Sequence, residues 1–184
     1  MTEKKRCRWC NPKNPLYVEY HDSEWCVARY DEQYLYEMLI LESFQAGLSW
    51  ECVLNKRESF RKAYDGFDID RVICYGTEKV DELMNNKEII RNRRKIEASI
   101  KNSRIFKAIA DEYGSFYSYL RGFTNDIRIY ESDRTTNELS DAISKDLRER
   151  GMTFVGSVII YSYLQAIGVI YSHDRECYLY KDGI

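Results

Sequence analysis

The stretch LRERGMTFVGS, residues 147–157, joins two segments whose apolar residues recur at helical spacing. Gly151 stands where a helix-ending glycine belongs, and a second apolar segment, SVIIYSYLQAIGVI, follows Gly156. The pattern predicts a helix, a tight hairpin over 151–156 and another helix. Backbone amides at the start of the second helix attract anions such as a DNA phosphate, although similar connections are common in proteins that bind none.

Helical spacing extends over most of the chain, and its two prolines, Pro12 and Pro15, precede the first periodic segment. The spacing predicts helices over 34–41, 48–64, 80–84, 87–113, 115–120, 141–150 and 157–170, with Asp31 and Ser140 as caps of the first and sixth. Residues 122–138 are polar and predict a loop. No alternating strand pattern of useful length and no internal repeat occurs. The predicted fold class is all-α, in one domain over 1–184 with two helical lobes.

Composition favours a soluble protein, since 44% of the 184 residues are hydrophobic and 32% are charged. There is no run of about 18 apolar residues, and the N-terminus MTEKKRCRW lacks the apolar stretch of a signal peptide. We therefore expect a cytoplasmic protein with reduced cysteines and no membrane contact. A monomer is the simplest expectation for its oligomeric state, which the sequence does not reveal. The net charge of −2 argues mildly against a nucleic-acid binder. Nevertheless, Arg91, Arg93, Arg94 and Lys95 cluster in IIRNRRKI, either as a solvated helix face or as a local basic patch.

Both histidines of the chain lie near its ends, one of them in YSHDRECY, residues 171–178. If this segment is helical, His173 and Cys177 share one face and can share one ion. His21 and either Cys7 or Cys10 could complete a four-ligand set, and thiolate with imidazole suits zinc. The competing interpretation is a surface histidine beside an ordinary buried cysteine.

A single carboxylate interrupts the apolar part of LESFQAGLSW, residues 41–50. Glu42 follows Leu39, Ile40 and Leu41, and a carboxylate in apolar surroundings is costly unless it is paired or used. It could equally lie on the helix surface. Tyr20 and the tryptophans, Trp9, Trp25 and Trp50, are similarly ambiguous between core and the wall of a pocket that stacks on a flat ligand.

These motifs together resemble the DNA-3-methyladenine glycosylase I family. The resemblance rests on RCRW (6–9), PLYVEYHDSEW (15–25), LYEMLILESFQAGLSW (35–50), IIRNRRKI (89–96), LRERGMTFVG (147–156), YSYLQAIG (161–168) and HDREC (173–177). It implies a helix-hairpin-helix DNA glycosylase fold in which a structural zinc site joins the N- and C-terminal segments, 7–21 and 173–177. Arg8 and Cys26 depart from the pattern, since the family often has glycine there.

The resemblance also implies a role for each matching residue. One structural Zn²⁺ per chain would be held by Cys7, His21, His173 and Cys177. Glu42 matches the catalytic-pocket carboxylate that recognises the methylated base, and the base-binding positions are Trp9, Tyr20, Trp25, Trp50 and Ser162. Among these, Tyr20 and Trp50 match the pair that sandwiches the base. The hairpin residues Gly151, Phe154 and Gly156 match DNA-binding positions.

The implied activity is that of a monofunctional DNA glycosylase that flips out 3-methyladenine from alkylated double-stranded DNA and excises it by hydrolysis in base excision repair. Its partner is damaged DNA, and no protein partner is evident. Two other functions remain open on sequence grounds. One is a zinc-containing helical module that binds DNA or a partner without catalysis. The other is a thiol redox protein using Cys7 and Cys10, which the metal site argues against.

Overall fold

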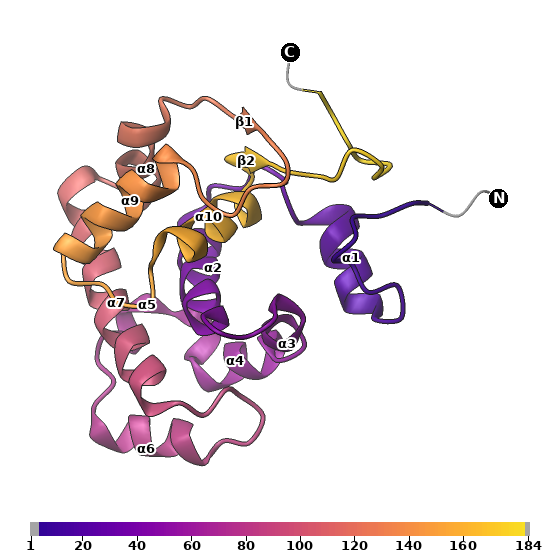
Figure 1. Ribbon diagram of the computed structural model, residues 1–184. Coiled ribbons are helices and arrows are strands. Elements are labelled where there is room, and N and C mark those ends of the chain that lie inside the picture. Colours follow the sequence, from indigo (N-terminus) through magenta and orange to yellow (C-terminus); the bar gives the residue numbers. More distant parts are fainter. Residues whose placement is uncertain (1–3, 183–184) are drawn as a thin grey trace.

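Helix α2 (Glu32–Gln45) occupies the centre of the molecule and is buried along most of its length (Figure 1). Asp31 caps it as predicted, because its side chain accepts a hydrogen bond from the amide of Tyr34. Apolar side chains cover all sides of the helix, as expected for a helix surrounded by others. Its contacts include α7, α8 and α10, so Glu42 is held on a rigid central element.

The computed structural model describes residues 4–182, and the fold over these residues is mostly helical, which confirms the predicted class. The remaining elements are α1 (Pro15–Ser23), α3 (Trp50–Leu54), α4 (Arg57–Ala63), η1 (Asp65–Phe67), α5 (Ile69–Val72), α6 (Thr77–Asn85), α7 (Arg93–Tyr113), α8 (Phe116–Thr124), β1 (Ile129–Tyr130), α9 (Glu138–Glu149), α10 (Ser157–Ala166) and β2 (Ile170–Tyr171). No helix among them is long and apolar enough to cross a membrane. The division into two lobes stays a prediction.

Several predicted boundaries were wrong because capping side chains override apolar spacing. The segment 48–64 is two helices, and the first begins after Ser49, whose hydroxyl accepts from the amide of Cys52. Helix α7 begins at Arg93 rather than Lys87, because Asn92 caps it. Helix α9 is capped by Asn137 rather than by Ser140, which forms the reciprocal half of a capping box.

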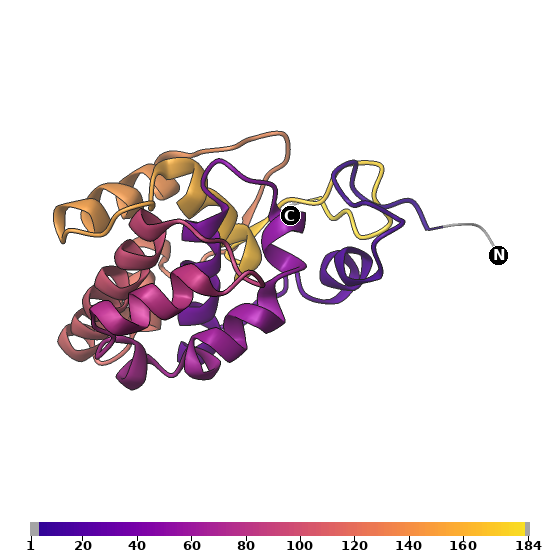
Figure 2. The same ribbon diagram turned by 90° about the horizontal axis from the view of Figure 1, so that it is seen from below.

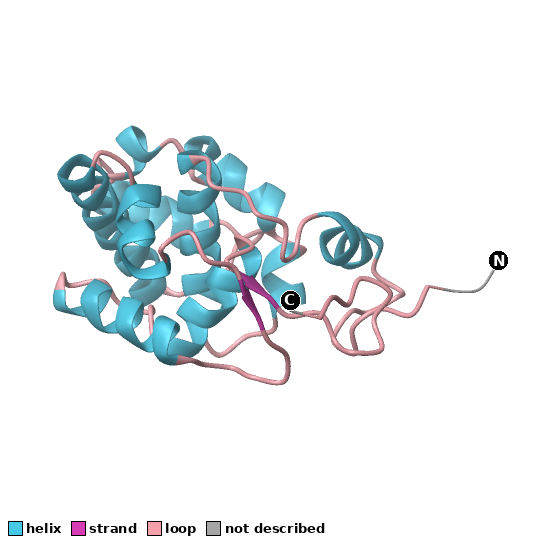
Figure 3. Ribbon diagram, turned by 90° about the horizontal axis from the view of Figure 1, so that it is seen from above, coloured by secondary structure: helices cyan, strands magenta, loops and turns pink. Residues whose placement is uncertain are grey.

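Several short elements fall where the sequence predicted none, among them α1, η1, α5 and β1. Helix α1 begins with Pro15. Proline suits a first helical turn because it lacks an amide hydrogen, and amide hydrogens in that turn have no acceptor within the helix. Strand β1 lies inside the predicted loop 122–138 and pairs in parallel with β2, which follows α10 (Figure 3). Helix α10 ends at Ala166 rather than near Ile170, and Gly168 then adopts a φ of +77°. The chain thereby turns out of α10 into β2 and onward to the C-terminal segment.

Segments near the two ends of the chain, around residues 5–10 and 173–178, lie side by side, next to α1 and away from the main helical body (Figure 2). The amide of Tyr178 donates to the carbonyl oxygen of Lys5 over 2.8 Å. The amide of Arg8 donates to the carboxylate of Asp174 over 2.7 Å. These bonds place residues from opposite ends of the sequence in one small region.

Candidate active site

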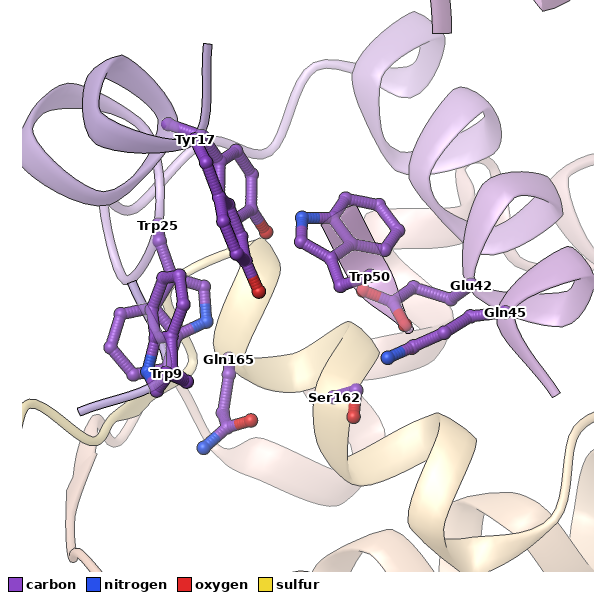
Figure 4. A pocket seen from close by; sticks show the side chains of 9 residues that line it. Trp9, Tyr17, Trp25, Glu42, Gln45, Trp50, Ser162 and Gln165 are labelled. Carbon is purple, nitrogen blue, oxygen red and sulfur yellow. The ribbon is translucent and has the colours of Figure 1, made fainter. Parts of the chain in front are cut away.

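One cavity of about 210 Å³ opens between α1, α2, α3 and α10 (Figure 4). All six residues predicted for the pocket line it: Trp9, Tyr20, Trp25, Glu42, Trp50 and Ser162. They come from the N-terminal segment, α1, the turn after α1, α2, α3 and α10. The fold thus brings together residues spread over almost the whole chain.

Glu42 supplies the carboxylate of this cavity. Its side chain is 2% exposed, and its Oε2 atom has no hydrogen-bond partner in the part of the chain that the structure describes. Burial raises the pKa of Glu42 well above its ordinary value. An unpartnered carboxylate oxygen in apolar surroundings is unfavourable, so the site is suited to a ligand that brings a hydrogen-bond donor, a positive charge, or both.

Trp50 presents an unsatisfied donor to the same region. It is 8% exposed, and its indole Nε1 has no acceptor among the described residues. Figure 4 shows the Trp50 ring beside the Glu42 carboxylate, with Trp9 and Trp25 across the cavity. The Trp9 and Trp25 rings pack edge to face, with centroids 4.7 Å apart. The cavity therefore combines aromatic walls with at least one buried acceptor and one buried donor.

The predicted sandwich of Tyr20 and Trp50 is closed in this structure. Their ring centroids lie 5.4 Å apart and the planes are inclined by 45°. A flat base between two rings needs them about 7 Å apart, twice a contact distance of about 3.5 Å. The two rings contact each other here, so they must separate before a base can lie between them.

Sequence reasoning missed three residues of the cavity, Tyr17, Gln45 and Gln165. Each lies three positions from a residue that was predicted: Tyr17 before Tyr20, Gln45 after Glu42, and Gln165 after Ser162. Residues three apart on a helix share a face, so this spacing was the available signal. The amide side chains of Gln45 and Gln165 add further polar groups to the lining.

A second cluster joins the chain ends. Cys7, His21, His173 and Cys177 are buried, and their potential ligand atoms all lie within 4.8 Å of one another. Cys7 Sγ is 3.4 Å from His173 Nδ1, and Cys177 Sγ is 3.5 Å from His21 Nε2. These are the four predicted side chains, and together they form a buried Cys2His2 cluster that could hold a metal ion.

The cluster forms without the helix considered for residues 173–177. That segment makes a turn, in which the amide of Cys177 donates to the carbonyl oxygen of Asp174 over 2.8 Å. Cys10, the alternative ligand, directs its Sγ toward the carbonyl oxygen of Tyr17, 3.8 Å away. Cys7 and Cys10 are both free thiols, so the structure contains no disulfide between them.

The surroundings of the cluster favour a cation. Burial raises the pKa of the Cys7 thiol, and burial together with the nearby His21 lowers the pKa of His173 to about 4. Neutral imidazoles leave a nitrogen lone pair free for a metal, and a bound metal ion offsets the cost of forming buried thiolates. His21 Nδ1 lies 2.8 Å from Asp22 Oδ1, an outer contact that orients its other nitrogen toward the cluster.

The predicted hairpin lies outside the cavity, between α9 and α10. Gly151 adopts a φ of +99°, which confirms the need for glycine at this position. Gly156 has an extended backbone with φ −64° and is the N-cap of α10. The other left-handed residue of the hairpin is Phe154, with φ +56°. Glycine is thus required conformationally at 151 but not at 156.

Comparisons with known proteins agree with this architecture. Residues 9–180 match the family model described as methyladenine glycosylase. DNA-3-methyladenine glycosylase 1 of Escherichia coli K12 is 39% identical over 182 residues, which cover 96% of this chain and 97% of that protein. The DNA-3-methyladenine glycosylase of Haemophilus influenzae is 36% identical over 94% of this chain and 96% of its own length.

Solved structures give the same result. A crystal structure of 3-methyladenine DNA glycosylase I superposes with a TM-score of 0.90 at 38% identity, covering 96% of this chain and all of that one. The Staphylococcus aureus enzyme, studied for its recognition of 3-methyladenine, superposes with a TM-score of 0.88 at 32% identity, covering 95% of this chain and 97% of its own. This chain belongs to the methyladenine glycosylase family.

Proposed function

We propose that this protein is a monofunctional DNA glycosylase that flips 3-methyladenine out of alkylated double-stranded DNA and releases it by hydrolysis, in base excision repair. The observation that carries the proposal is the buried, unpartnered carboxylate oxygen of Glu42 in an aromatic cavity. Family membership supports the same activity. Extrusion of a damaged base costs less than extrusion of a well-stacked normal one.

The proposed selectivity is electrostatic. Methylation at N3 gives adenine a positive charge, and aromatic faces such as those of Trp9 and Trp25 attract cationic rings. The carboxylate of Glu42 adds a charge-assisted hydrogen bond that neutral adenine cannot match. The indole N–H of Trp50 remains available as a donor to a ring nitrogen. Entry of the base between Tyr20 and Trp50 requires these two rings to separate.

The proposed chemistry needs little acid catalysis, because the cationic base is already a good leaving group. The bond from the sugar C1′ to the base breaks, and its electron pair neutralises the ring. A water oxygen bonds to C1′ and its proton passes to solvent. No lysine lines the cavity within residues 4–182, so no covalent amine intermediate and no strand cleavage are expected.

We propose zinc, one ion per chain, as the metal of the Cys2His2 cluster. Zn–S bonds of about 2.3 Å and Zn–N bonds of about 2.0–2.1 Å in a tetrahedron place sulfur and nitrogen about 3.6 Å apart. The sulfur–nitrogen distances here are 3.4 Å and 3.6 Å to His173 and 3.5 Å to His21. With four protein ligands the ion has no open position, so its contribution is structural.

The hairpin is the proposed first contact with DNA. Gly156 has no side chain to cap α10, so the amides of the first turn are available to a phosphate oxygen. Gly151 and Phe154 shape the turn that presents them. A single chain supplies the complete cavity and the complete cluster, which supports a monomer as the active unit; light scattering of the purified protein tests this.

The test of the proposed activity is release of the free base. Duplex DNA treated with a methylating agent is incubated with metal-loaded, folded protein, and free 3-methyladenine is measured by chromatography against a control without protein. Release with intact strands supports a monofunctional glycosylase. Absence of release, with binding to DNA retained, would instead support a non-catalytic DNA-binding module.

A further inference from the structure

The basic cluster at the start of α7 is divided by the fold into three different environments. Arg93 forms ion pairs with Asp81 at 2.5 Å and with Glu97 at 3.8 Å. Lys95 is buried, with 8% of its surface exposed. Arg94 is exposed and has no carboxylate within 4.0 Å among residues 4–182. Only part of this cluster is therefore a surface neutralised by neighbouring acids.

Arg94 lies in a surface groove between α7 and the hairpin. The groove has a volume of about 470 Å³ and is lined by Arg94, Glu97, Ala98, Lys101, Thr153 and Phe154. Lys101, like Arg94, has no ion pair with any described residue. A Cβ placed on Gly151 would lie only 3.4 Å from Lys101 Nζ, so the ammonium group lies directly against the hairpin.

The groove is held in shape by side chain to backbone bonds. Asn102 Nδ2 donates to the carbonyl oxygen of Thr153 over 2.8 Å, and Asn102 Oδ1 accepts from the Thr153 amide over 3.0 Å. Asn102 is fully buried, and the pair of bonds joins α7 rigidly to the hairpin. Below the groove, Lys95 Nζ lies 5.8 Å from the centre of the Phe154 ring and adds positive charge.

Arg94 and Lys101 are two exposed cations without a carboxylate partner among the described residues, in contrast to Arg93 on the same helix. The one carboxylate of the groove, Glu97, is held by Arg93 on the same helix. Arg94 and Lys101 lie about two turns apart on α7, on the same side of the groove. A planar guanidinium and a mobile ammonium in this arrangement suit the oxygens of a phosphate group. Because the groove adjoins the hairpin, a DNA strand on the first turn of α10 is within reach of it.

We propose that Arg94 and Lys101 bind a phosphodiester of the DNA backbone in this groove, as a second contact beside the amides of α10. This proposal rests on the proposed function, because it takes DNA as the substrate. The contact is independent of base sequence and contributes to holding the duplex rather than to recognising the lesion. It assigns to part of the basic cluster a function other than solvation.

The experiment compares charge-matched variants of neighbouring residues. Arg94→Ala, Lys101→Ala and the double variant are compared with Arg93→Ala, which also removes one exposed positive charge from α7 but one that is already paired. The dissociation constant for an undamaged duplex is measured as a function of salt concentration. Each phosphate contact contributes about 0.9 to the slope of log K against log salt.

We expect the double variant to lose about 0.9 from that slope, the contribution of one phosphate, and Arg93→Ala to retain the wild-type slope. Glu97→Gln removes the carboxylate from the groove and is expected to tighten DNA binding several-fold. Arg94→Lys is expected to restore part of the loss, which separates loss of charge from loss of folding. Equal slopes for the double variant and Arg93→Ala would overturn the proposal.

Two further readouts separate this proposal from the proposed function. Affinity for free 3-methyladenine is expected to be unchanged in all groove variants, because none of these residues lines the cavity. One outcome is that the wild-type protein releases no 3-methyladenine while the double variant shows a reduced salt dependence of DNA binding. The proposed glycosylase activity is then wrong, and the proposed phosphate contact is retained. If the base is released but the salt slopes of the variants do not differ, only the proposed phosphate contact of Arg94 and Lys101 is wrong.

Discussion

The ammonium nitrogen of Lys95 lies 2.8 Å from the carbonyl oxygen of Phe44, so the first turn of α7 is bonded to the last turn of α2. Lys95 donates a second bond to the carbonyl oxygen of Ala46, the C-cap of α2. Carbonyls at a helix C-terminus lack helical partners and carry partial negative charge, so a cation there is favourable. This buried cation fixes the segment that leads from Glu42 to Trp50.

Replacement of Lys95 by methionine tests that role. The change keeps the length of the side chain but leaves two carbonyl groups without their charged donor, and we expect a loss of about 2–3 kcal/mol in the free energy of unfolding. Affinity for the free base should fall as well, because the position of Trp50 is loosened. Urea unfolding is the measurement. Lys101→Met on the exposed side of the same helix should change stability by less than about 0.5 kcal/mol.

Glu42→Gln is expected to weaken binding of free 3-methyladenine by about 10- to 100-fold. The substitution replaces a charge-assisted hydrogen bond, worth about 1.5–3 kcal/mol, with a neutral one. Calorimetric titration measures the affinity. Glu58→Gln, a change of the same kind at a carboxylate that is 73% exposed, is the control and should leave affinity unchanged. Equal affinities of wild-type protein and Glu42→Gln would remove Glu42 from base recognition.

The same substitution should have the opposite effect on stability. Burial raises the pKa of Glu42, so above the ordinary value of 4.5 the native state retains a proton that the unfolded state releases. The contribution of Glu42 to the free energy of unfolding therefore falls by about 1.4 kcal/mol for each pH unit, from pH 4.5 up to its raised pKa in the native state. Glu42→Gln lacks this loss, so its stability relative to wild type should grow from pH 4.5 upward. Urea unfolding of both proteins across pH measures the difference.

Removal of a metal ligand should separate the two N-terminal cysteines. Cys177→Ala is expected to abolish metal binding and to lower stability by about 4 kcal/mol, by analogy with a disulfide that closes a long loop. Cys10→Ala should retain one metal ion per chain, because Cys10 points toward Tyr17 rather than into the cluster. Elemental analysis and urea unfolding measure both effects. Loss of metal in Cys10→Ala alone would show that the ligand set is different.

Gly168 should not tolerate a side chain. Its φ is +77°, and an added Cβ would lie 2.4 Å from the backbone nitrogen of Ala28. We expect Gly168→Ala to cost more than about 3 kcal/mol, because a backbone atom cannot move aside as a flexible side chain can. Gly122 in α8 is the matched control, since a Cβ there meets nothing within 4 Å. Gly122→Ala should stabilise the protein by about 0.5–1 kcal/mol. Thermal unfolding of the two variants measures whether Gly168→Ala lowers stability and Gly122→Ala raises it.

The sequence predicted the helical class and the central helix because their signals are local. Asp31 caps α2, and the apolar residues of that helix recur at helical spacing. Helix α1 and the β1–β2 pair were missed because both are short and depend on contacts from elsewhere in the chain. The parallel pair joins Ile129 to Ile170, and the residues around either strand do not indicate which distant segment it pairs with.

Chemistry of the site was predictable from the residue types, whereas its geometry was not. Glu42 among apolar neighbours indicated a buried carboxylate, and both histidines near cysteines indicated a metal site. Cys26 has a positive φ of +61°. A positive φ favours glycine, which is the residue that the resemblance led us to expect at this position. The closed contact of Tyr20 with Trp50 depends on ring orientation, which spacing along the chain does not determine.

The histidines of the Cys2His2 cluster touch the tryptophans of the cavity wall. The ring of His173 lies 4.8 Å from that of Trp25, and the ring of His21 lies 5.2 Å from that of Trp9. Any metal that fixes these imidazoles also restricts the indoles behind them. Whatever factor the metal contributes to affinity for the base, the base must contribute the same factor to affinity for the metal. Removal of the metal should therefore change the affinity for the base, although the cluster has no open position for substrate. Conversely, binding of the lesion base should slow the loss of metal to a chelator.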